Sequence, residues 1–273
     1  MTNSSHVPVL VVNAFTDTLF GGNPAAVVET DIPLADGTMQ SIAEQHNLSE
    51  TAFLVRKGVD HFHLRWFTPA REVPLCGHAT LASAYALDYL GHWAGERLTF
   101  DTASGPLYVT RDGDRYRIEF PAVFMNEVAT PDKVAAALGV PVVRSFLPSN
   151  GAWQMVCELA DEATLKACSP DFSALAIATD LGVSITAARS DVDYVSRFFI
   201  PQLGINEDPV TGSAHCQLVP LWAARFSKTT LRARQLSARG GELSGTLDGD
   251  RVVLAGQCCL FSEGRILLPS ELV

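Results

Sequence analysis

Two long apolar runs dominate the pattern of polar and apolar positions along the chain. From Ala79 to Leu87 and from Cys216 to Ala224, no residue carries a charge. A Pro-x-x-Gly turn stands shortly before each run and ends at Gly77 or at Gly212. A helix that is apolar on every side must be covered on every side. We therefore predict two buried helices, each of which begins at its glycine.

Shorter apolar and alternating stretches surround both runs, and Gly, Asn and Asp turns bound them. Such stretches predict strands, at residues 7–15, 25–28, 62–67, 98–100, 107–110, 115–120, 183–189 and 192–200. Periodic stretches predict further helices at residues 37–46, 163–168 and 172–177. This mixture of elements predicts an α+β fold.

Short motifs recur in the same order in the two halves of the 273-residue chain. Pro-x-x-Gly recurs after 135 residues (209 − 74), and so does Ser-x-Thr-Ala (184 − 49). Arg-x-Phe-x-Pro recurs after 132 (197 − 65) and Asp-Gly-Asp-Arg after 136 (248 − 112). Similarity at a fixed period marks duplicated units. We predict two pseudo-symmetric domains, residues 1–124 and 125–273, each a curved sheet rolled around a central helix; the extreme C-terminus could pack back on the first.

Composition and charge exclude several classes of partner. An apolar fraction of 47% and a charged fraction of 18% are typical of a compact protein. The net charge is −10 and no run of Lys or Arg occurs, so we expect neither a nucleic-acid nor a membrane partner. The first residues lack a basic leader, and the six cysteines show no Cys-x-x-Cys spacing. Reduced thiols predict a cytoplasmic protein.

Two acidic residues stand where the repeat breaks its own symmetry. Glu50 lies inside the first Ser-x-Thr-Ala motif, and the aligned residue of the second motif is Ile185. Asp208 precedes the second Pro-x-x-Gly turn, where the first turn is preceded by Val73. If the two domains face each other across a pseudo-twofold cleft, the two carboxylates can meet there. A carboxylate in an apolar cleft can take up and return a proton near neutral pH.

The two glycine-rich helix starts predict a binding site for an anion. Gly77 and Gly212 leave backbone N–H groups and the positive end of a helix dipole accessible, and Ser213 adds a hydroxyl donor. The ligand we expect is a small-molecule carboxylate substrate. His78 either assists as an acid or donor to the substrate, or caps and packs the first helix.

The sequence contains no motif for a metal or a cofactor. His, Cys and acidic residues do not occur at metal-ligand spacing. The glycine motifs for dinucleotides and phosphates and the G-x-S-x-G motif are also missing. We therefore predict chemistry that needs neither a metal nor a cofactor.

With these residues assembled, the chain resembles the phenazine-biosynthesis PhzF-like family, within the diaminopimelate epimerase-like superfold. The matching stretches span nearly the whole chain, and they are residues 12–16, 21–25, 47–53, 67–69, 76–80 and 204–215. The resemblance implies two similar domains, a homodimer, and an isomerase in which a Glu moves a proton between carbons of a cyclic dihydroxy-diene acid.

The resemblance also assigns roles residue by residue. Glu50 matches the catalytic Glu, and Asp208, His78 and Ser213 match supporting residues. Ser49 and Gly77 match positions near the substrate. We therefore predict a cofactor-independent isomerase that moves a proton on a small carboxylate-bearing substrate.

Three secondary candidates leave a second reaction class open: Cys76, Asn23 and Thr211. Diaminopimelate epimerases and proline racemases use two cysteines, one immediately before each glycine-rich helix start. Cys76 and Thr211 stand at those places here. A threonine is a poor base, which disfavours a two-thiol epimerase. A Cys76-dependent epimerase, racemase or dehydratase of an amino-acid derivative remains an alternative, as does a non-catalytic binding protein.

Overall fold

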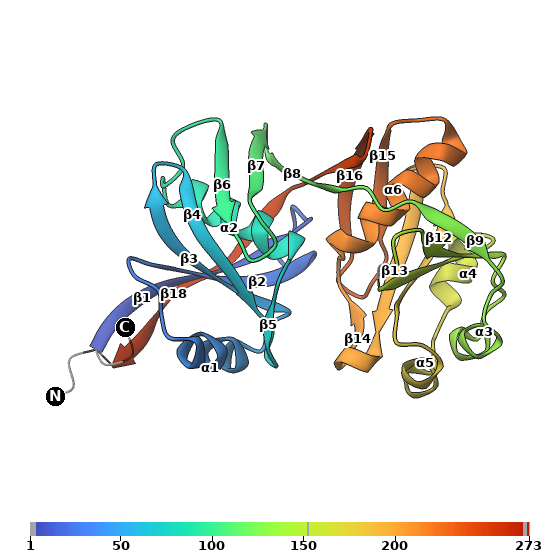
Figure 1. The fold of residues 1–273 in the computed structure, drawn as a ribbon, viewed down its shortest axis with the longest axis horizontal. Coiled ribbons are helices and arrows are strands. Elements are labelled where there is room, and N and C mark those ends of the chain that lie inside the picture. The colour runs from blue at the N-terminus through green and yellow to red at the C-terminus, as the bar shows by residue number, and fades with distance from the viewer. Residues whose placement is uncertain (1–3, 152, 270–271, 273) are drawn as a thin grey trace. The chain divides into compact units, whose positions relative to one another are not determined.

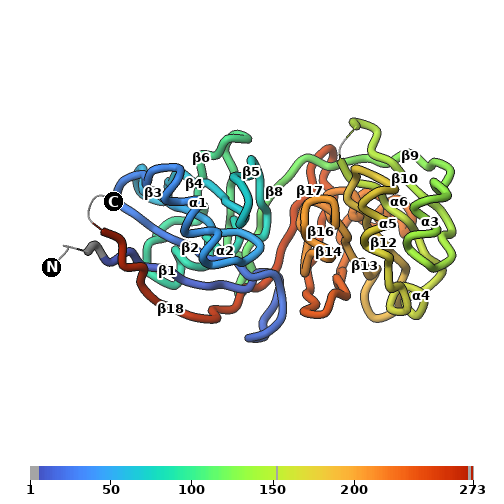
Figure 2. Tube along the Cα trace, turned by 90° about the horizontal axis from the view of Figure 1, so that it is seen from below, coloured from blue at the N-terminus to red at the C-terminus, as the bar shows by residue number. Residues whose placement is uncertain are grey.

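The computed structural model describes residues 4–151, 153–269 and 272. Contacts divide the chain into unit 1, Met1–Glu119 with Ala255–Val273, and unit 2, Phe120–Leu254. The first segment of unit 1 ends at Glu119 and unit 2 begins at Phe120, close to the predicted boundary between residues 124 and 125. The C-terminal strand, red in Figure 1, runs among the blue and teal strands of unit 1 in both views (Figures 1 and 2). Among the described residues, no helix is long and apolar enough to cross a membrane.

The strands of unit 1 form a curved sheet. In order across it lie β18 (Cys258–Pro269), β1 (Ser4–Ala14), β2 (Asn23–Thr30), β3 (Glu50–Gly58), β4 (His61–Phe67), β6 (Arg97–Asp101), β7 (Leu107–Asp112) and β8 (Arg115–Pro121), with β5 (Glu72–Val73) beside β4. Neighbouring strands are antiparallel except for the pairs β2–β3 and β4–β6. The β18–β1 pairing joins the end of the chain to its beginning.

Helices cover both faces of this sheet. The buried helix α2 (Gly77–Tyr89) contacts β1, β2, β3 and β18, and α1 (Asp36–His46) packs on β3 and β4. Successive side chains of a strand point to opposite faces. Phe53 of β3 accordingly packs against α1, while its neighbours Ala52 and Leu54 are fully buried on the face toward α2. The prediction of a sheet around a central helix is confirmed for this unit.

Unit 2 repeats the same pairing scheme. Its strands in order are β9 (Met125–Val128), β10 (Arg144–Pro148), β11 (Gln154–Glu158), β12 (Gly182–Ala188), β13 (Tyr194–Ile200), β15 (Thr230–Gln235) and β16 (Gly241–Asp248), with β14 (Ile205–Asp208) beside β13 and β17 (Arg251–Gly256) following β16. The parallel pairs are β11–β12 and β13–β15. They correspond to β2–β3 and β4–β6 of unit 1, so the predicted internal repeat is confirmed.

The second buried helix, α6 (Gly212–Phe226), lies against β15 and β16. Its Trp222 stacks on Tyr194 of β13, and the indole N–H donates to Thr186 of β12. The other face of the sheet carries the predicted helices α4 (Glu162–Ala167) and α5 (Phe172–Ala178), together with α3 (Asp132–Leu138), which the sequence did not predict.

One ion pair recurs at the same place in both units. Arg65 of β4 donates from Nε and Nη2 to the two carboxylate oxygens of Glu72, at 2.7 Å each. Arg197 of β13 does the same to Glu207, at 2.7 and 2.9 Å. Each guanidinium also lies over the Phe two residues later, 5.1 and 5.0 Å from the ring centre. These two arginines therefore mark equivalent positions in the repeat.

This equivalence corrects one prediction. Arg65 pairs with Phe53, whereas Arg197 pairs with Ile185. Ile185 therefore matches Phe53, and the prediction that it matches Glu50 was wrong: the two Ser-x-Thr-Ala motifs are three residues out of structural register. In the strand register, Glu50 corresponds to Gly182, the first residue of β12.

Unit 2 has no room for a side chain at the position equivalent to Glu50. A Cβ atom at Gly182 would lie 2.4 Å from Cζ of Phe198, closer than such atoms approach one another. The asymmetry of the repeat is thus sharper than predicted. The position that holds a carboxylate in unit 1, Glu50, is occupied in unit 2 by a glycine, which has no side chain, rather than by an apolar residue.

The two Arg–Glu bridges should differ in their contribution to stability. The Arg197 side chain is 14% exposed and that of Arg65 is 23% exposed; Arg197 also donates to the carbonyl of Cys168. We expect Glu207→Gln to lower the free energy of unfolding by about 1–3 kcal/mol, because it leaves a largely buried cation without its partner. Glu72→Gln should cost less than about 1 kcal/mol. Chemical denaturation of both variants checks this, and an equal or reversed order would contradict it.

Candidate active site

The N-terminus of α2 presents backbone N–H groups without a side-chain cap. The N-cap residue Cys76 is extended, with φ −146° and ψ 111°, and its side chain forms no capping hydrogen bond. Gly77 is the first helical residue, as predicted, and His78 the second. The first N–H groups of a helix need partners from outside it, and together with the dipole they favour an anion.

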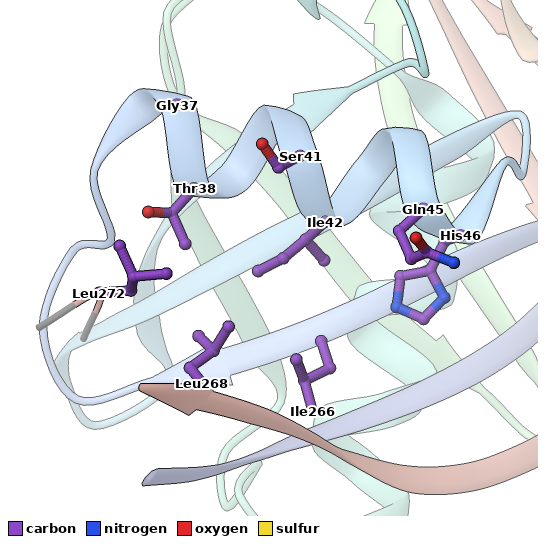
Figure 3. Close-up of a pocket in the computed structure, with 9 residues that line it drawn as sticks. All are labelled: Gly37, Thr38, Ser41, Ile42, Gln45, His46, Ile266, Leu268 and Leu272. Atoms are coloured by element: carbon purple, nitrogen blue, oxygen red, sulfur yellow. The ribbon is translucent and has the colours of Figure 1, made fainter. Parts of the chain in front are cut away.

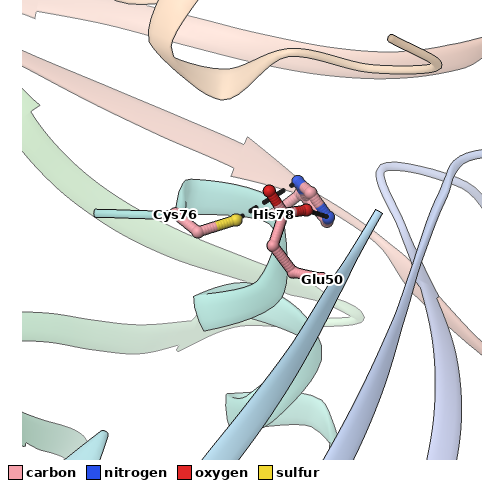
Figure 4. A group of neighbouring side chains, drawn as sticks. All are labelled: Glu50, Cys76 and His78. Carbon is pink, nitrogen blue, oxygen red and sulfur yellow. Dashed lines mark hydrogen bonds and ion pairs between the residues drawn. The ribbon is translucent and has the colours of Figure 1, made fainter. Parts of the chain in front are cut away.

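Three predicted residues come together at this helix start (Figure 4). Glu50, the first residue of β3, places Oε2 3.0 Å from Nε2 of His78. The thiol of Cys76 lies 3.5 Å from the other ring nitrogen, Nδ1. Cys76 and His78 are buried, while the Glu50 side chain remains 15% exposed. A buried acid–imidazole pair with partial access to solvent can exchange protons with a bound ligand.

Asn23 and Ser49 fix the orientation of the imidazole. Ser49 Oγ donates to Asn23 Oδ1 at 2.9 Å, and Asn23 Nδ2 lies 3.3 Å from Nδ1 of His78. An amide N–H can only donate, so a neutral ring accepts at Nδ1 and carries its proton on Nε2. A protonated ring carries that proton as well. In either state the protonated Nε2 lies 3.0 Å from Glu50 Oε2, an ion-pair contact in which neither atom has hydrogen-bond geometry.

Burial and charge act on this group in opposite directions. Burial lowers the pKa of His78, but negative charge at Cys76 and Glu50 outweighs burial and raises the pKa above its ordinary value. Burial raises the pKa of the Cys76 thiol, and the Glu50 charge raises it further. Burial therefore favours the neutral form of the Cys76 thiol, whereas the negative charge of Glu50 beside His78 favours the protonated imidazole.

Glu50, Cys76 and His78 also form a possible set of metal ligands, since their ligand atoms lie within 4.8 Å of one another. The thiol and the carboxylate, however, contact opposite nitrogens of one imidazole ring. A zinc ion binds a single nitrogen of a histidine, with all ligand atoms about 2.0–2.3 Å away. The observed side-chain positions therefore do not suit a metal ion, and a metal-free reaction stays our prediction.

The second predicted cluster lies at the end of β14 and the start of α6 in unit 2. Thr211, the N-cap residue, donates from Oγ1 to the carboxylate of Asp208. Gln235 of β15 donates to Thr211 Oγ1 at 3.1 Å and to the Asp208 carbonyl at 2.8 Å, and it accepts from the Thr211 N–H at 2.9 Å. Because the Thr211 proton is committed to Asp208, Thr211 is held as a donor and cannot act as the base that a second thiol would provide.

Gly212 begins α6, as predicted, and Ser213 follows it on the exposed surface. The Ser213 hydroxyl accepts a hydrogen bond from Gln154. Sequence reasoning missed Gln154 and Gln235, because a single glutamine inside a strand carries no motif or spacing. His215 is fully buried and bonded to Tyr194, and burial lowers its pKa to about 4. It is a neutral core residue.

The structure thus groups the predicted residues within each unit. Asn23, Ser49, Glu50, Cys76 and His78 form one cluster, and residues 208–213 form another. That Glu50 and Asp208 share a cleft stays a prediction.

A separate pocket on unit 1 contributes nothing to this chemistry (Figure 3). It lies between α1 and the end of β18, and it is lined by Gly37, Thr38, Ser41, Ile42, Gln45, His46, Ile266, Leu268 and Leu272. The described residues that line it include no acid and no thiol. Burial lowers the pKa of its histidine, His46. Among the described lining residues His46 is the only acid–base group, so they supply no acid–base pair for proton transfer.

Comparisons with known proteins agree on one family. A family model described as phenazine biosynthesis-like protein (PhzC-PhzF) matches residues 12–264. An uncharacterized isomerase of Pseudomonas aeruginosa is 49% identical over 257 residues, which cover 94% of this chain and 97% of the relative. A human phenazine biosynthesis-like domain-containing protein is 35% identical over 285 residues, covering 95% of this chain and 99% of the relative.

Solved structures show the same relationship. The crystal structure of a PhzF-family protein from Enterococcus faecalis superposes with a TM-score of 0.92 at 44% identity, covering 97% of this chain and 100% of that one. A hydroxyproline epimerase from Agrobacterium vitis shares the fold alone, with a TM-score of 0.62 at 12% identity. The superposition covers 99% of this chain and 95% of that one. The fold is therefore diaminopimelate epimerase-like, and the chain belongs to the phenazine biosynthesis-like (PhzF) family.

Proposed function

We propose that the protein is a cofactor-independent isomerase that moves a proton between carbons of a small carboxylate-bearing substrate, with Glu50 as base and then acid. The observation that carries the proposal is the Glu50–His78 contact of 3.0 Å at the uncapped start of α2. Three bacterial relatives are named as uncharacterized isomerases, which supports the reaction class.

The proposed step needs only groups of this chain. The Glu50 carboxylate takes a proton from a substrate carbon, and the electron pair of that C–H bond moves into the adjacent unsaturated or carboxyl-bearing system. Glu50 then returns the proton to a second carbon as the electron pair moves there. His78 offsets the negative charge of Glu50 before the transfer through their ion-pair contact of 3.0 Å. No electrons enter or leave, so the product has the mass of the substrate.

The residues of unit 2 have binding roles in this proposal. Ser213 and the N–H groups that begin α6 at Gly212 would hold the substrate carboxylate, as would those at Gly77 in unit 1. Asp208, oriented by Thr211 and Gln235, would position the substrate or shuttle a proton. The proposed reaction requires no metal and no cofactor.

A Cys76-dependent epimerase, racemase or dehydratase is the alternative that the structure disfavours. A thiolate is the reactive form of cysteine, and burial raises the pKa of the Cys76 thiol. We therefore expect alkylation of Cys76 by iodoacetamide at pH 7 to be slower than alkylation of a model thiol, and to accelerate as the pH rises. Peptide mass spectrometry can follow Cys76 separately from the other five cysteines. Rapid alkylation at pH 7 would contradict the burial argument and favour the thiol mechanism.

We further propose that the protein acts as a homodimer in the cytoplasm. The six cysteines are free thiols in the structure, which suits a reducing compartment. Light scattering of the purified protein tests the dimer, and a monomer at micromolar concentration would contradict it.

A substrate screen tests the proposed reaction class. The protein is incubated with cyclic and linear unsaturated carboxylic acids, and proton NMR follows conversions that leave the mass unchanged. We expect a double bond to shift position in one group of acids. Loss of water from hydroxy acids, or inversion of amino acids without a double-bond shift, would favour the alternative instead.

A further inference from the structure

Two buried glutamines lie behind Ser213 in unit 2. Gln154 begins β11, and Gln217 lies one helical turn after Ser213 on α6; their exposed fractions are 1% and 3%. Gln217 Nε2 donates to Gln154 Oε1 at 2.7 Å, and Gln154 Nε2 donates to Ser213 Oγ at 2.8 Å. Burying polar amides costs free energy that apolar side chains of equal size would not. This pair of bonds, the Gln217–Gln154 relay, therefore indicates a role beyond filling the core.

The order of donors in the relay determines where the Ser213 proton points. A serine hydroxyl has one proton and two lone pairs. Gln154 directs an N–H at Oγ, and its own amide oxygen is occupied by Gln217. The Ser213 proton is therefore directed away from the relay. Since Ser213 is exposed beside the uncapped start of α6, that proton is available to a ligand there.

The reverse order of bonds is less favourable. If Ser213 donated to Gln154, the side-chain amides of Gln154 and Gln217 would both have to rotate so that their oxygen and NH₂ group exchange places. The NH₂ group of Gln217 would then lose its acceptor inside the core. In the observed order, Gln217 lacks a hydrogen bond only at Oε1 among the described residues. A buried acceptor without a partner is tolerated better than a buried donor. The observed order also directs positive amide hydrogens toward the anion-favouring end of α6.

We propose that the Gln217–Gln154 relay aims the Ser213 hydroxyl proton at a carboxylate of the ligand bound at the start of α6. This inference rests on the proposed function for the nature of the ligand, a small carboxylate. Ser213 touches the ligand, whereas Gln154 and Gln217 are positioning residues that act through it. Ser213 therefore recognises the ligand as an acceptor of a hydrogen bond.

A double-mutant cycle with two defined probes tests this. Isothermal titration measures binding of benzoate and of cyclohex-1-enecarboxylate to the wild type, Gln154→Met, Ser213→Ala and the double variant. We expect Gln154→Met to weaken binding of at least one probe about threefold to tenfold, the effect of losing one well-directed hydrogen bond. In the Ser213→Ala background, the same change should alter binding less than about twofold, because the relay acts only through that hydroxyl.

A second variant tests the direction of the relay. Gln154→Glu replaces an amide donor with a carboxylate that only accepts, so Ser213 would turn its proton inward. We expect this variant to weaken binding of the probe more than Gln154→Met does. Binding that equals the wild type would overturn the proposed donor order.

The controls separate positioning from general damage. Gln40→Met removes an amide of unit 1 that donates to the carbonyls of Thr68 and Pro69, and it should leave binding unchanged. Thermal denaturation of each variant checks that the fold is retained. An effect of Gln154→Met that persists undiminished in the Ser213→Ala background would overturn the relay.

The same titrations distinguish this inference from the proposed function. Failure of both probes to bind the wild type would overturn the carboxylate assignment and the inference with it. Binding with the expected coupling would support the relay even if the substrate screen finds no isomerisation, in which case the proposed function alone fails.

Discussion

Replacing Glu50 with glutamine is expected to lower kcat about 10²–10⁴-fold, the contribution typical of a general acid or base. The amide keeps the size of the side chain and its place at the start of β3, but it cannot accept and return a proton. The change should be measured with the substrate that the screen identifies, under saturating conditions, so that a loss of binding does not imitate a loss of catalysis.

Two comparisons control this experiment. Glu72→Gln removes a carboxylate of the Arg65 ion pair by the same chemical change and should leave kcat within about twofold, since it lies outside the cluster of Glu50, Cys76 and His78. Retained secondary structure by circular dichroism shows that Glu50→Gln folds. A kcat near that of the wild type would remove Glu50 from the mechanism.

Replacing Trp222 with alanine is expected to lower the free energy of unfolding by about 3–5 kcal/mol, the usual cost of deleting a large buried aromatic side chain. Trp222 is 1% exposed, stacks on Tyr194 and Phe226, and donates to Thr186. The variant leaves a cavity where α6 meets the sheet and also leaves a buried hydroxyl without its donor. Chemical denaturation followed by circular dichroism measures the loss.

Trp153→Ala provides the matched control for that experiment. Trp153 is 48% exposed and packs edge-on against Phe198, so its removal should cost about 1–2 kcal/mol, well below the loss at Trp222. Similar losses for the two variants would contradict the central position of α6 in unit 2.

The fold was predictable because its elements repeat. The apolar runs that follow Gly77 and Gly212 predicted both buried helices, and each helix begins at the predicted residue. The two Asp-Gly-Asp-Arg motifs likewise lie at matching turns, after β7 and after β16. The helix α3, which begins after Pro131 without a side-chain cap, was not predicted.

Strand register could not be predicted from short motifs. The Ser-x-Thr-Ala motif made Ile185 the counterpart of Glu50, but the backbone ladder assigns that place to Gly182. A motif of three identical residues recurs easily by chance, whereas register depends on the pairing of whole strands. The conclusion that one carboxylate breaks the symmetry survived, because neither Ile185 nor Gly182 carries a charge.

The active-site residues that carry charge or a thiol were predictable, and those that orient them were not. Glu50, Cys76 and His78 stand at helix and strand starts that the sequence marks with glycine and turn residues. Gln154, Gln217 and Gln235 act through hydrogen bonds to residues far away in the chain. Nothing in the sequence near these glutamines shows which residues they contact, so only the fold could identify them.

Solvent exchange tests the central claim, that Glu50 is the base, most directly. Wild type, Cys76→Ser and Glu50→Gln are incubated with the identified substrate in D₂O, and NMR measures deuterium at the substrate and product carbons. The account predicts deuterium incorporation by the wild type and by Cys76→Ser, and none above background with Glu50→Gln. Incorporation that survives in Glu50→Gln and disappears in Cys76→Ser would contradict it and make the thiol the base.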